Sequence, residues 1–125
     1  MDADLVLVPT ELPLLPARLR ETGFTVEAFP LSINARRGSS QLRIQFTTDE
    51  RYAGFPGRAQ EMSVLGVMVS VASLEDVFQG KLWAWSDPTR RLTKRKKDEL
   101  DLLRLAETYP GLRVGLPGEL RSLLP

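Results

Sequence analysis

The order of two hydrophobic periods along the chain is the feature that most constrains its fold. Between residues 24 and 46 apolar and polar side chains alternate, and in the stretch QLRIQF the residues Leu42, Ile44 and Phe46 share one face. A period of two is typical of β-strands. Beyond Ser73 apolar residues recur at spacings of three and four, which is typical of amphipathic helices. Strands early and helices late predict an α+β fold with a mixed β-sheet and helices packed on it.

The expected elements follow from these patterns and from the positions of Gly and Pro. Asp4–Val8 is predicted to be a central strand covered on both sides, because its apolar run serves both faces. The other expected strands are Phe24–Phe29, Leu31–Ala35 and Gln41–Phe46, the last two as an antiparallel hairpin, and two short strands around Gly66. Four helices are expected. The first ends near Thr22, the second runs from Ser73 to about Trp85, the third runs from about Thr93 to Thr108, and the fourth starts near Pro117.

The residue types that the chain lacks narrow the chemistry open to it. Its 125 residues, which predict a single domain over residues 1–125, include no cysteine and no histidine. Disulfides, imidazole bases and zinc sites of Cys and His are therefore excluded, and any metal must be a hard cation such as Mg²⁺ held by oxygen. No apolar stretch approaches a membrane span, so we expect no membrane partner and take a cytoplasmic location as the default.

Two carboxylates, Asp2 and Asp4, stand at the head of the first predicted strand. Residues two apart in a strand project from the same face of the sheet. A carboxylate pair at a strand end can hold Mg²⁺, whose remaining ligands are phosphate oxygens. The alternative is that the first residues of the chain are frayed and solvated.

Lys81 is a charged residue inside an apolar helical stripe. The stripe consists of Leu74, Val77, Phe78, Leu82 and Trp85. A lysine in that position either reaches the rim of the apolar surface or pairs with an acid. Asp98 and Asp101 offer the partner, because residues three apart share a helix face. Acids near a helix N-terminus are also favourable by themselves, which accounts for Asp98 better than for Asp101.

The segment Arg90–Lys97, RRLTKRKK, carries six cations and no acid in a chain whose net charge is only +1. Such a run is a candidate site for phosphate, RNA or an acidic protein partner. The alternative is a solvated loop and helix start, although cations there oppose the helix dipole.

Taken together these pieces resemble a known family. The stretch VASLEDVFQGKLWAWSDPTRRLTKRKKDELDLLRL is similar to the C-terminal part of nucleotidyltransferase-like proteins related to the AbiEii toxin family, within the polymerase-beta-type nucleotidyltransferase superfamily. GSSQLRIQFTTDERY resembles the central strand region of such proteins. The shared features are a leading D-x-D strand (Asp2, Asp4), a helix with an acid and a lysine (Asp76, Lys81) and a K-D-x-x-D helix (Lys97, Asp98, Asp101).

The resemblance implies a nucleotidyltransferase-like fold and Mg²⁺-dependent transfer of a nucleoside monophosphate from a nucleoside triphosphate to a hydroxyl. Its implied catalytic residues are Asp2, Asp4, Lys81 and Asp101, its implied metal ligands are Asp2 and Asp4, and its implied nucleotide-binding residues are Lys81, Lys97 and Asp98. In this scheme Lys81 contacts phosphate or positions Asp101. A toxin–antitoxin setting is implied in the same way.

Two departures from the family pattern predict an incomplete site. The helix and Gly-Gly/Ser turn that cradle the triphosphate are missing before Asp2, so we expect an N-terminally truncated domain. Gln45 stands where a third carboxylate is expected, and an amide cannot replace a charged metal ligand.

We therefore expect a degenerate or minimal nucleotidyltransferase-like domain that is incomplete as a single chain. A homodimer is expected, because a first strand without its preceding helix exposes apolar surface. The alternative is a non-enzymatic regulatory module that retains the fold and binds RNA or a protein partner.

Overall fold

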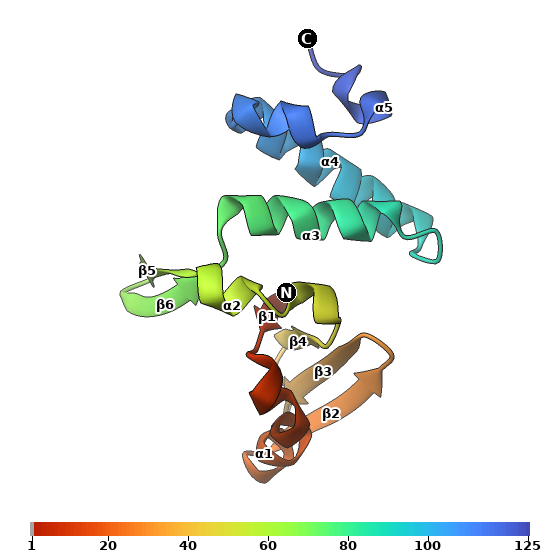
Figure 1. Cartoon of the computed structure of the whole chain (residues 1–125). Coiled ribbons are helices and arrows are strands. Elements are labelled where there is room, and N and C mark those ends of the chain that lie inside the picture. Colours follow the sequence, from red (N-terminus) through yellow and green to blue (C-terminus); the bar gives the residue numbers. More distant parts are fainter. Residues whose placement is uncertain (1) are drawn as a thin grey trace. The chain divides into compact units, whose positions relative to one another are not determined.

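The structure is a computed structural model that describes residues 2–125, and it confirms the predicted α+β class with a mixed sheet. The chain divides into two compact units, one ending at Val71 and the other running from Ala72 to Pro125 (Figure 1). Each unit has a hydrophobic core of its own. Cooperative folding of the two units as one domain over residues 1–125 stays a prediction.

The first unit contains a four-stranded sheet in the order β1-β4-β3-β2. Its strands are β1 (Asp2–Val6), β2 (Phe24–Phe29), β3 (Ser32–Arg37) and β4 (Arg43–Thr47). β1 runs parallel to β4, whereas β4 with β3 and β3 with β2 pair antiparallel. The predicted hairpin of the third and fourth strands is therefore confirmed.

The prediction that the first strand is central was wrong. β1 is an edge strand of this sheet, begins at Asp2 and ends at Val6, and Leu5 is 44% exposed. A run that is apolar on both faces indicates that both faces of the strand are covered. It does not determine whether a second strand pairs with each of its edges. Here β1 finds one neighbour, β4, after a connection of four elements (η1, α1, β2 and β3), and strand order of this kind depends on contacts that are distant in sequence.

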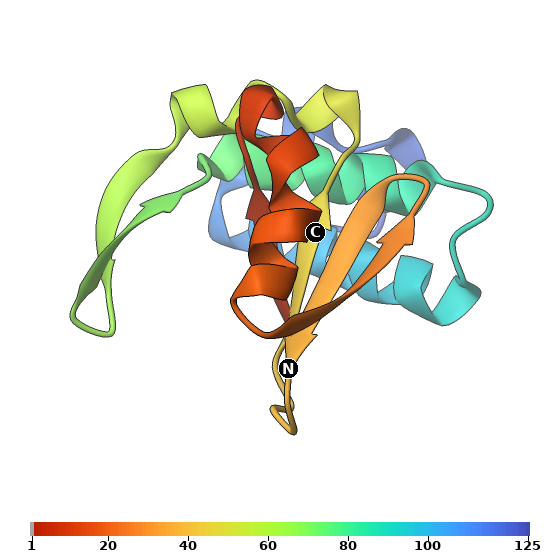
Figure 2. The ribbon, with the colours of Figure 1, turned by 90° about the horizontal axis from the view of Figure 1, so that it is seen from below.

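One face of the sheet is apolar and is covered by a helix. The alternating strands direct Ile33, Ala35 and Phe46 into this core, where all three are buried. After β1 the chain forms a 3₁₀ helix, η1 (Pro9–Leu14), and α1 (Leu15–Glu21), whose residues Leu15 and Leu19 pack on the same core (Figure 2). Alternation directs Asp4, Gln45, Asn34 and Glu27 to the opposite face, which is mostly polar.

A second, two-stranded sheet completes the first unit. η2 (Glu50–Tyr52) and α2 (Phe55–Arg58) lead to β5 (Gln60–Val64) and β6 (Val67–Val71), which pair antiparallel and confirm the two strands predicted around Gly66. The turn residues Leu65 and Gly66 both have positive φ, 51° and 81°. That combination defines a type I′ turn, which matches the twist of a tight hairpin.

The second unit is helical. It comprises α3 (Leu74–Ser86), α4 (Leu92–Thr108), η3 (Pro110–Gly115) and α5 (Gly118–Arg121). Ser73 caps α3 as predicted, because its hydroxyl accepts a hydrogen bond of 3.1 Å from the Asp76 amide. The unit's core consists of Phe78, Leu102, Ala106, Leu116 and Leu120. Among the residues that the structure describes, no helix has the length and apolar character needed to cross a bilayer.

Candidate functional site

The leading carboxylates lie on the polar face of the four-stranded sheet. Asp2 and Asp4 are both in β1, and their register partners in β4 are Arg43 and Gln45. Partners on neighbouring strands project from the same face at about 5 Å spacing. Gln45, predicted from the sequence to replace the third carboxylate, is thus the direct neighbour of Asp4.

The row that starts at Asp4 continues across the sheet. Gln45 is paired with Asn34 in β3, and Asn34 with Glu27 in β2. We call Asp4, Gln45, Asn34 and Glu27 the polar row. Over β2 and β3 a shallow hollow of about 480 Å³ adjoins this row and is lined in part by Glu27, Asn34 and Arg43.

Two buried polar atoms near this hollow lack a hydrogen-bond partner among the described residues. They are Asn34 Oδ1 and Arg43 Nε. A buried polar group without a partner costs about 1–3 kcal/mol. The polar face of the sheet therefore has unsatisfied hydrogen-bonding capacity, which sequence patterns cannot reveal because it depends on the register of three strands.

Arg43 competes with a metal for Asp2. Its Nη2 lies 2.8 Å from Asp2 Oδ2, an ion pair between partly exposed side chains. With Asp2 compensated, the carboxylates of this row that form no ion pair within residues 2–125 are Asp4 and Glu27, which stand at opposite ends of the row with the neutral amides of Gln45 and Asn34 between them. Mg²⁺ is bound through carboxylates and phosphates, so this donor set fits the ion poorly. Among residues 2–125 no group of three acidic side chains is arranged to hold a metal.

Asp49 does not supply the missing carboxylate to the polar row. It follows the end of β4, caps η2 through a 3.0 Å hydrogen bond from the Arg51 amide, and forms a 2.7 Å ion pair with the Arg51 guanidinium. The hydrogen bond from the Arg51 side chain lowers the pKa of Asp49 below its ordinary value, although burial opposes the shift. Its carboxylate is committed to this local turn.

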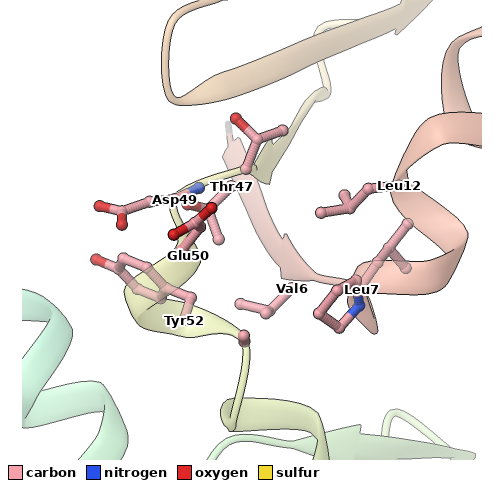
Figure 3. Close-up of a pocket in the computed structure, with 10 residues that line it drawn as sticks. Val6, Leu7, Leu12, Thr47, Asp49, Glu50 and Tyr52 are labelled. Atoms are coloured by element: carbon pink, nitrogen blue, oxygen red, sulfur yellow. Dashed lines mark hydrogen bonds between the residues drawn. The ribbon is translucent and has the colours of Figure 1, made fainter.

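Asp49 also lines a small cavity of about 70 Å³ in the first unit. Figure 3 shows the apolar side chains of Val6, Leu7 and Leu12 in its lining, together with Thr47 at the end of β4 and Asp49, Glu50 and Tyr52 from the segment that follows. A volume of this size holds only a few water molecules. It is too small for a nucleotide.

In the second unit the predicted lysine and acids do meet. Lys81 Nζ of α3 lies 2.8 Å from Asp101 Oδ2 and 3.3 Å from Asp98 Oδ1, both in α4. Arg90, in the loop between the helices, places its Nε 2.6 Å from Asp98 Oδ2. We call Lys81, Arg90, Asp98 and Asp101 the ion-pair cluster. The predicted pairing of Lys81 with an acid of the last long helix is confirmed.

Asp98 is the buried centre of the ion-pair cluster. Its side chain is 2% exposed, whereas those of Lys81 and Arg90 are 32% and 35% exposed. Burial acts to lower the pKa of Lys81, but the hydrogen bond and charge of Asp101, together with Asp98, outweigh it and raise the pKa above its ordinary value. Lys81 is therefore a firmly charged residue that ties α3 to α4.

The basic run is divided by the structure into cations with internal partners and free cations. Arg90 binds Asp98, Arg95 donates to the Trp85 carbonyl at 3.1 Å, and Lys96 pairs with Glu99 at 3.2 Å. The remaining cations of the run are Arg91, Lys94 and Lys97, which are exposed and form no ion pair within residues 2–125. Their spacing of three residues places them along one side of α4 and its start.

Sequence reasoning missed two contacts in this unit. Arg90 was assigned to the basic run, although it completes the ion-pair cluster, and a partner eight residues away across a helix start leaves no periodic signal. Trp85 donates its indole N–H to Glu99 at 3.0 Å, and this hydrogen bond lowers the pKa of Glu99. An aromatic residue on an apolar stripe with a polar tip was the available signal for such a partner.

Comparisons with known proteins yielded no matching family model, no similar curated protein and no similar solved structure.

The candidate residues fall into two groups, with Asp2 and Asp4 in the first unit and Lys81, Lys97, Asp98 and Asp101 in the second. Convergence of the two groups on a single pocket stays a prediction.

Proposed function

We propose that this chain is a degenerate nucleotidyltransferase-like protein that keeps the family's acidic strand but has lost the ability to transfer nucleotides. The observation that carries the proposal is the pairing of Asp4 with Gln45 across β1 and β4. Two-metal transfer places carboxylates around both ions, so that they can stabilise the attacking and leaving oxygens. A neutral amide beside Asp4 removes one of the charges on which that arrangement depends.

Arg43 supports the same interpretation from the other end of the pair. Its guanidinium neutralises Asp2 at 2.8 Å, where the family pattern expects a metal. An arginine is permanently charged, so a metal would have to displace it. An ion pair between partly exposed side chains stabilises a protein by at most about 1 kcal/mol. A tightly bound metal could therefore displace Arg43 from Asp2, whereas a weakly bound metal could not.

Lys81 fits a positioning role better than a phosphate-binding role. Its ammonium group donates to two carboxylates of α4, one of them buried. Because phosphate would have to compete with both, we assign Lys81 to holding Asp98 and Asp101 in place. In the family pattern, Mg²⁺ binding and nucleotide binding by Lys97 and Asp98 accompany catalysis, so our proposal entails the loss of both. A toxin–antitoxin setting is a proposal that rests on the family resemblance alone.

The first test is titration calorimetry of the whole chain with each of the four nucleoside triphosphates and Mg²⁺. We expect no binding tighter than about 100 µM, which corresponds to about −5.5 kcal/mol. Submicromolar binding that is lost in an Asp4→Ala variant would contradict the proposal. The same outcome would restore the catalytic interpretation of Asp2 and Asp4.

A gain-of-function variant sharpens this test. Gln45→Asp places a second carboxylate beside Asp4, and we expect it to bind Mn²⁺, detected by electron paramagnetic resonance, at least tenfold more tightly than the unaltered chain. Ser32→Asp is the matched control, because it adds the same charge to the same face of the sheet at a position whose register partners, Phe29 and Thr47, are not acidic. Equal Mn²⁺ affinities of the two variants would show that position 45 is not part of a latent metal site.

A second candidate function has its own observation. Arg91, Lys94 and Lys97 are exposed cations without an ion-pair partner among the described residues, on one side of the start of α4. This arrangement supports a non-enzymatic module that binds the phosphates of RNA. It requires no metal and no catalytic residue, so it is compatible with loss of nucleotidyl transfer.

A further inference from the structure

The hairpin of β5 and β6 has one apolar and one polar face. Register pairs Met62 with Val69 and Val64 with Val67, and alternation places Val71 on the same side. We call Met62, Val64, Val67, Val69 and Val71 the apolar hairpin face. The opposite side carries Glu61, Ser63, Met68 and Ser70.

The apolar hairpin face is open to solvent. Met62 is 51%, Val64 45%, Val67 60% and Val69 38% exposed. The hairpin forms a sheet of its own and projects away from the four-stranded sheet of the same unit (Figure 1 and Figure 2). An isolated two-stranded hairpin is marginally stable in water, and contiguous apolar surface of this kind marks an interaction site.

The tip of the hairpin carries a residue in an unusual conformation. Leu65 is fully exposed and has a φ of 51°, in the left-handed region that side chains other than Gly, Asn and Asp rarely adopt. An ordinary type I′ turn carries Asn or Gly at this position. A large apolar residue held in a strained and fully exposed position is an outlier of the kind that accompanies binding surfaces.

We propose that the apolar hairpin face is a self-association surface, which stacks on the same face of a second copy of this chain. A twofold interface brings each patch against itself, so a patch with like charges would repel its copy. This face carries no charged residue, and the hairpin's one acid, Glu61, is on the opposite side. Two copies of the patch can therefore meet through apolar side chains without like-charge repulsion.

The size of the patch sets the strength of the dimer. An exposed apolar patch of about 300–600 Å² on each copy buries roughly 600–1,200 Å² in total when two copies stack. Interfaces of that size belong to weak or transient complexes. We therefore expect a dissociation constant on the order of 10–100 µM, with the hairpin becoming more ordered as the dimer forms.

Sedimentation equilibrium of the whole chain from 1 to 500 µM tests the proposal. Val69→Lys introduces a charge at the centre of the apolar hairpin face, and we expect it to weaken the dimer at least 30-fold. Ser63→Lys is the matched control, since it adds the same side chain to the same hairpin on the opposite face. We expect it to change the dissociation constant less than threefold.

Each other outcome overturns the proposal. A chain that stays monomeric at 500 µM, or a control variant that weakens the dimer as much as Val69→Lys, would show that the surface is not a self-association face. If Val69→Lys fails to fold by circular dichroism, Val67→Thr provides the measurement, because it keeps the size of the side chain and should weaken the dimer about three- to tenfold. An unchanged dissociation constant in Val67→Thr would overturn the proposal.

Discussion

At the scale of single residues, Asp98 is the member of the ion-pair cluster whose loss leaves the most charge without compensation. Its side chain is 2% exposed and meets both Lys81 and Arg90. Asp98→Ala removes the acid that pairs with Arg90 and leaves Lys81 with Asp101 as its acid in the ion-pair cluster. Lys81→Met leaves Asp98 paired with Arg90, and Asp101, at 28% exposure, can be solvated.

We therefore predict that Asp98→Ala lowers the free energy of unfolding by about 2–3 kcal/mol, and Lys81→Met by less than about 1 kcal/mol. Urea denaturation measures both. Lys96→Met is the matched control for the loss of a lysine. Within residues 2–125 the ion pair of Lys96 is with Glu99 alone, its side chain is 65% exposed, and its loss should change stability by less than about 0.5 kcal/mol. Similar, negligible effects from all three variants would make the ion-pair cluster a surface feature.

The raised pKa of Lys81 gives the same variants a second readout. A lysine whose pKa is higher in the folded chain than in the unfolded chain stabilises the fold below the unfolded value, which is ordinarily 10.5, and this stabilisation is lost as pH rises through the folded value. The unaltered chain should lose stability above about pH 10 more steeply than Lys81→Met. An identical dependence of stability on pH in the unaltered chain and in Lys81→Met would contradict a raised pKa of Lys81.

Residue pairs of this kind were only partly open to prediction. The contact of Lys81 with Asp98 and Asp101 followed from a charge inside an apolar stripe and from two acids three residues apart. Arg90 was hidden because a loop has no period. The ion pair of Asp2 with Arg43 joins strands that are 41 residues apart in sequence and depends on their register.

At the scale of elements, the type I′ turn of the second hairpin holds a residue that its geometry disfavours. Leu65 at a φ of 51° costs about 1–2 kcal/mol relative to a residue that tolerates this region. We predict that Leu65→Asn raises the free energy of unfolding by about 1 kcal/mol and the melting temperature by a few degrees. The measurement is thermal unfolding at 1 µM, where a dimer of the expected affinity is dissociated.

Gly66→Ala provides the opposing control at the same turn. Its φ of 81° is unfavourable for any side chain, although the space around it is open, so this variant should lose stability. If Leu65→Asn were neutral or destabilising, the strain argument for Leu65 would be wrong.

Elements were predicted well where the signal was local and poorly where it was not. β2 occupies Phe24–Phe29 as expected, and α4 begins one residue before the predicted start, because alternation, caps and Gly or Pro positions act within a few residues. The place of β1 at the sheet edge was missed, since an apolar run does not say how many neighbours a strand will find. The exposure of the second hairpin was likewise invisible, because alternation gives an apolar face but not what covers it.

At the scale of the whole molecule, a net charge of +1 hides a local imbalance. Three cations of the basic run have internal partners, whereas Arg91, Lys94 and Lys97 face solvent without an acid partner among the described residues. Binding of RNA through phosphates depends on such a local stripe and releases counterions, so it must weaken with salt. Overall charge alone would produce only a weak attraction without a preferred surface.

Fluorescence anisotropy with a labelled 20-nucleotide single-stranded RNA between 50 and 200 mM salt separates these two cases. We predict that Lys94→Gln/Lys97→Gln reduces the slope of log affinity against log salt by about 1.4, or 0.7 for each phosphate contact. Arg20→Gln/Arg36→Gln removes the same charge from exposed positions of the first unit and should leave the slope unchanged. Equal losses in both variants would mean that net charge, rather than the side of α4, attracts the RNA. No measurable binding at 50 mM salt would remove the RNA-binding candidate and leave the polar face of the sheet as the chain's remaining candidate for a ligand.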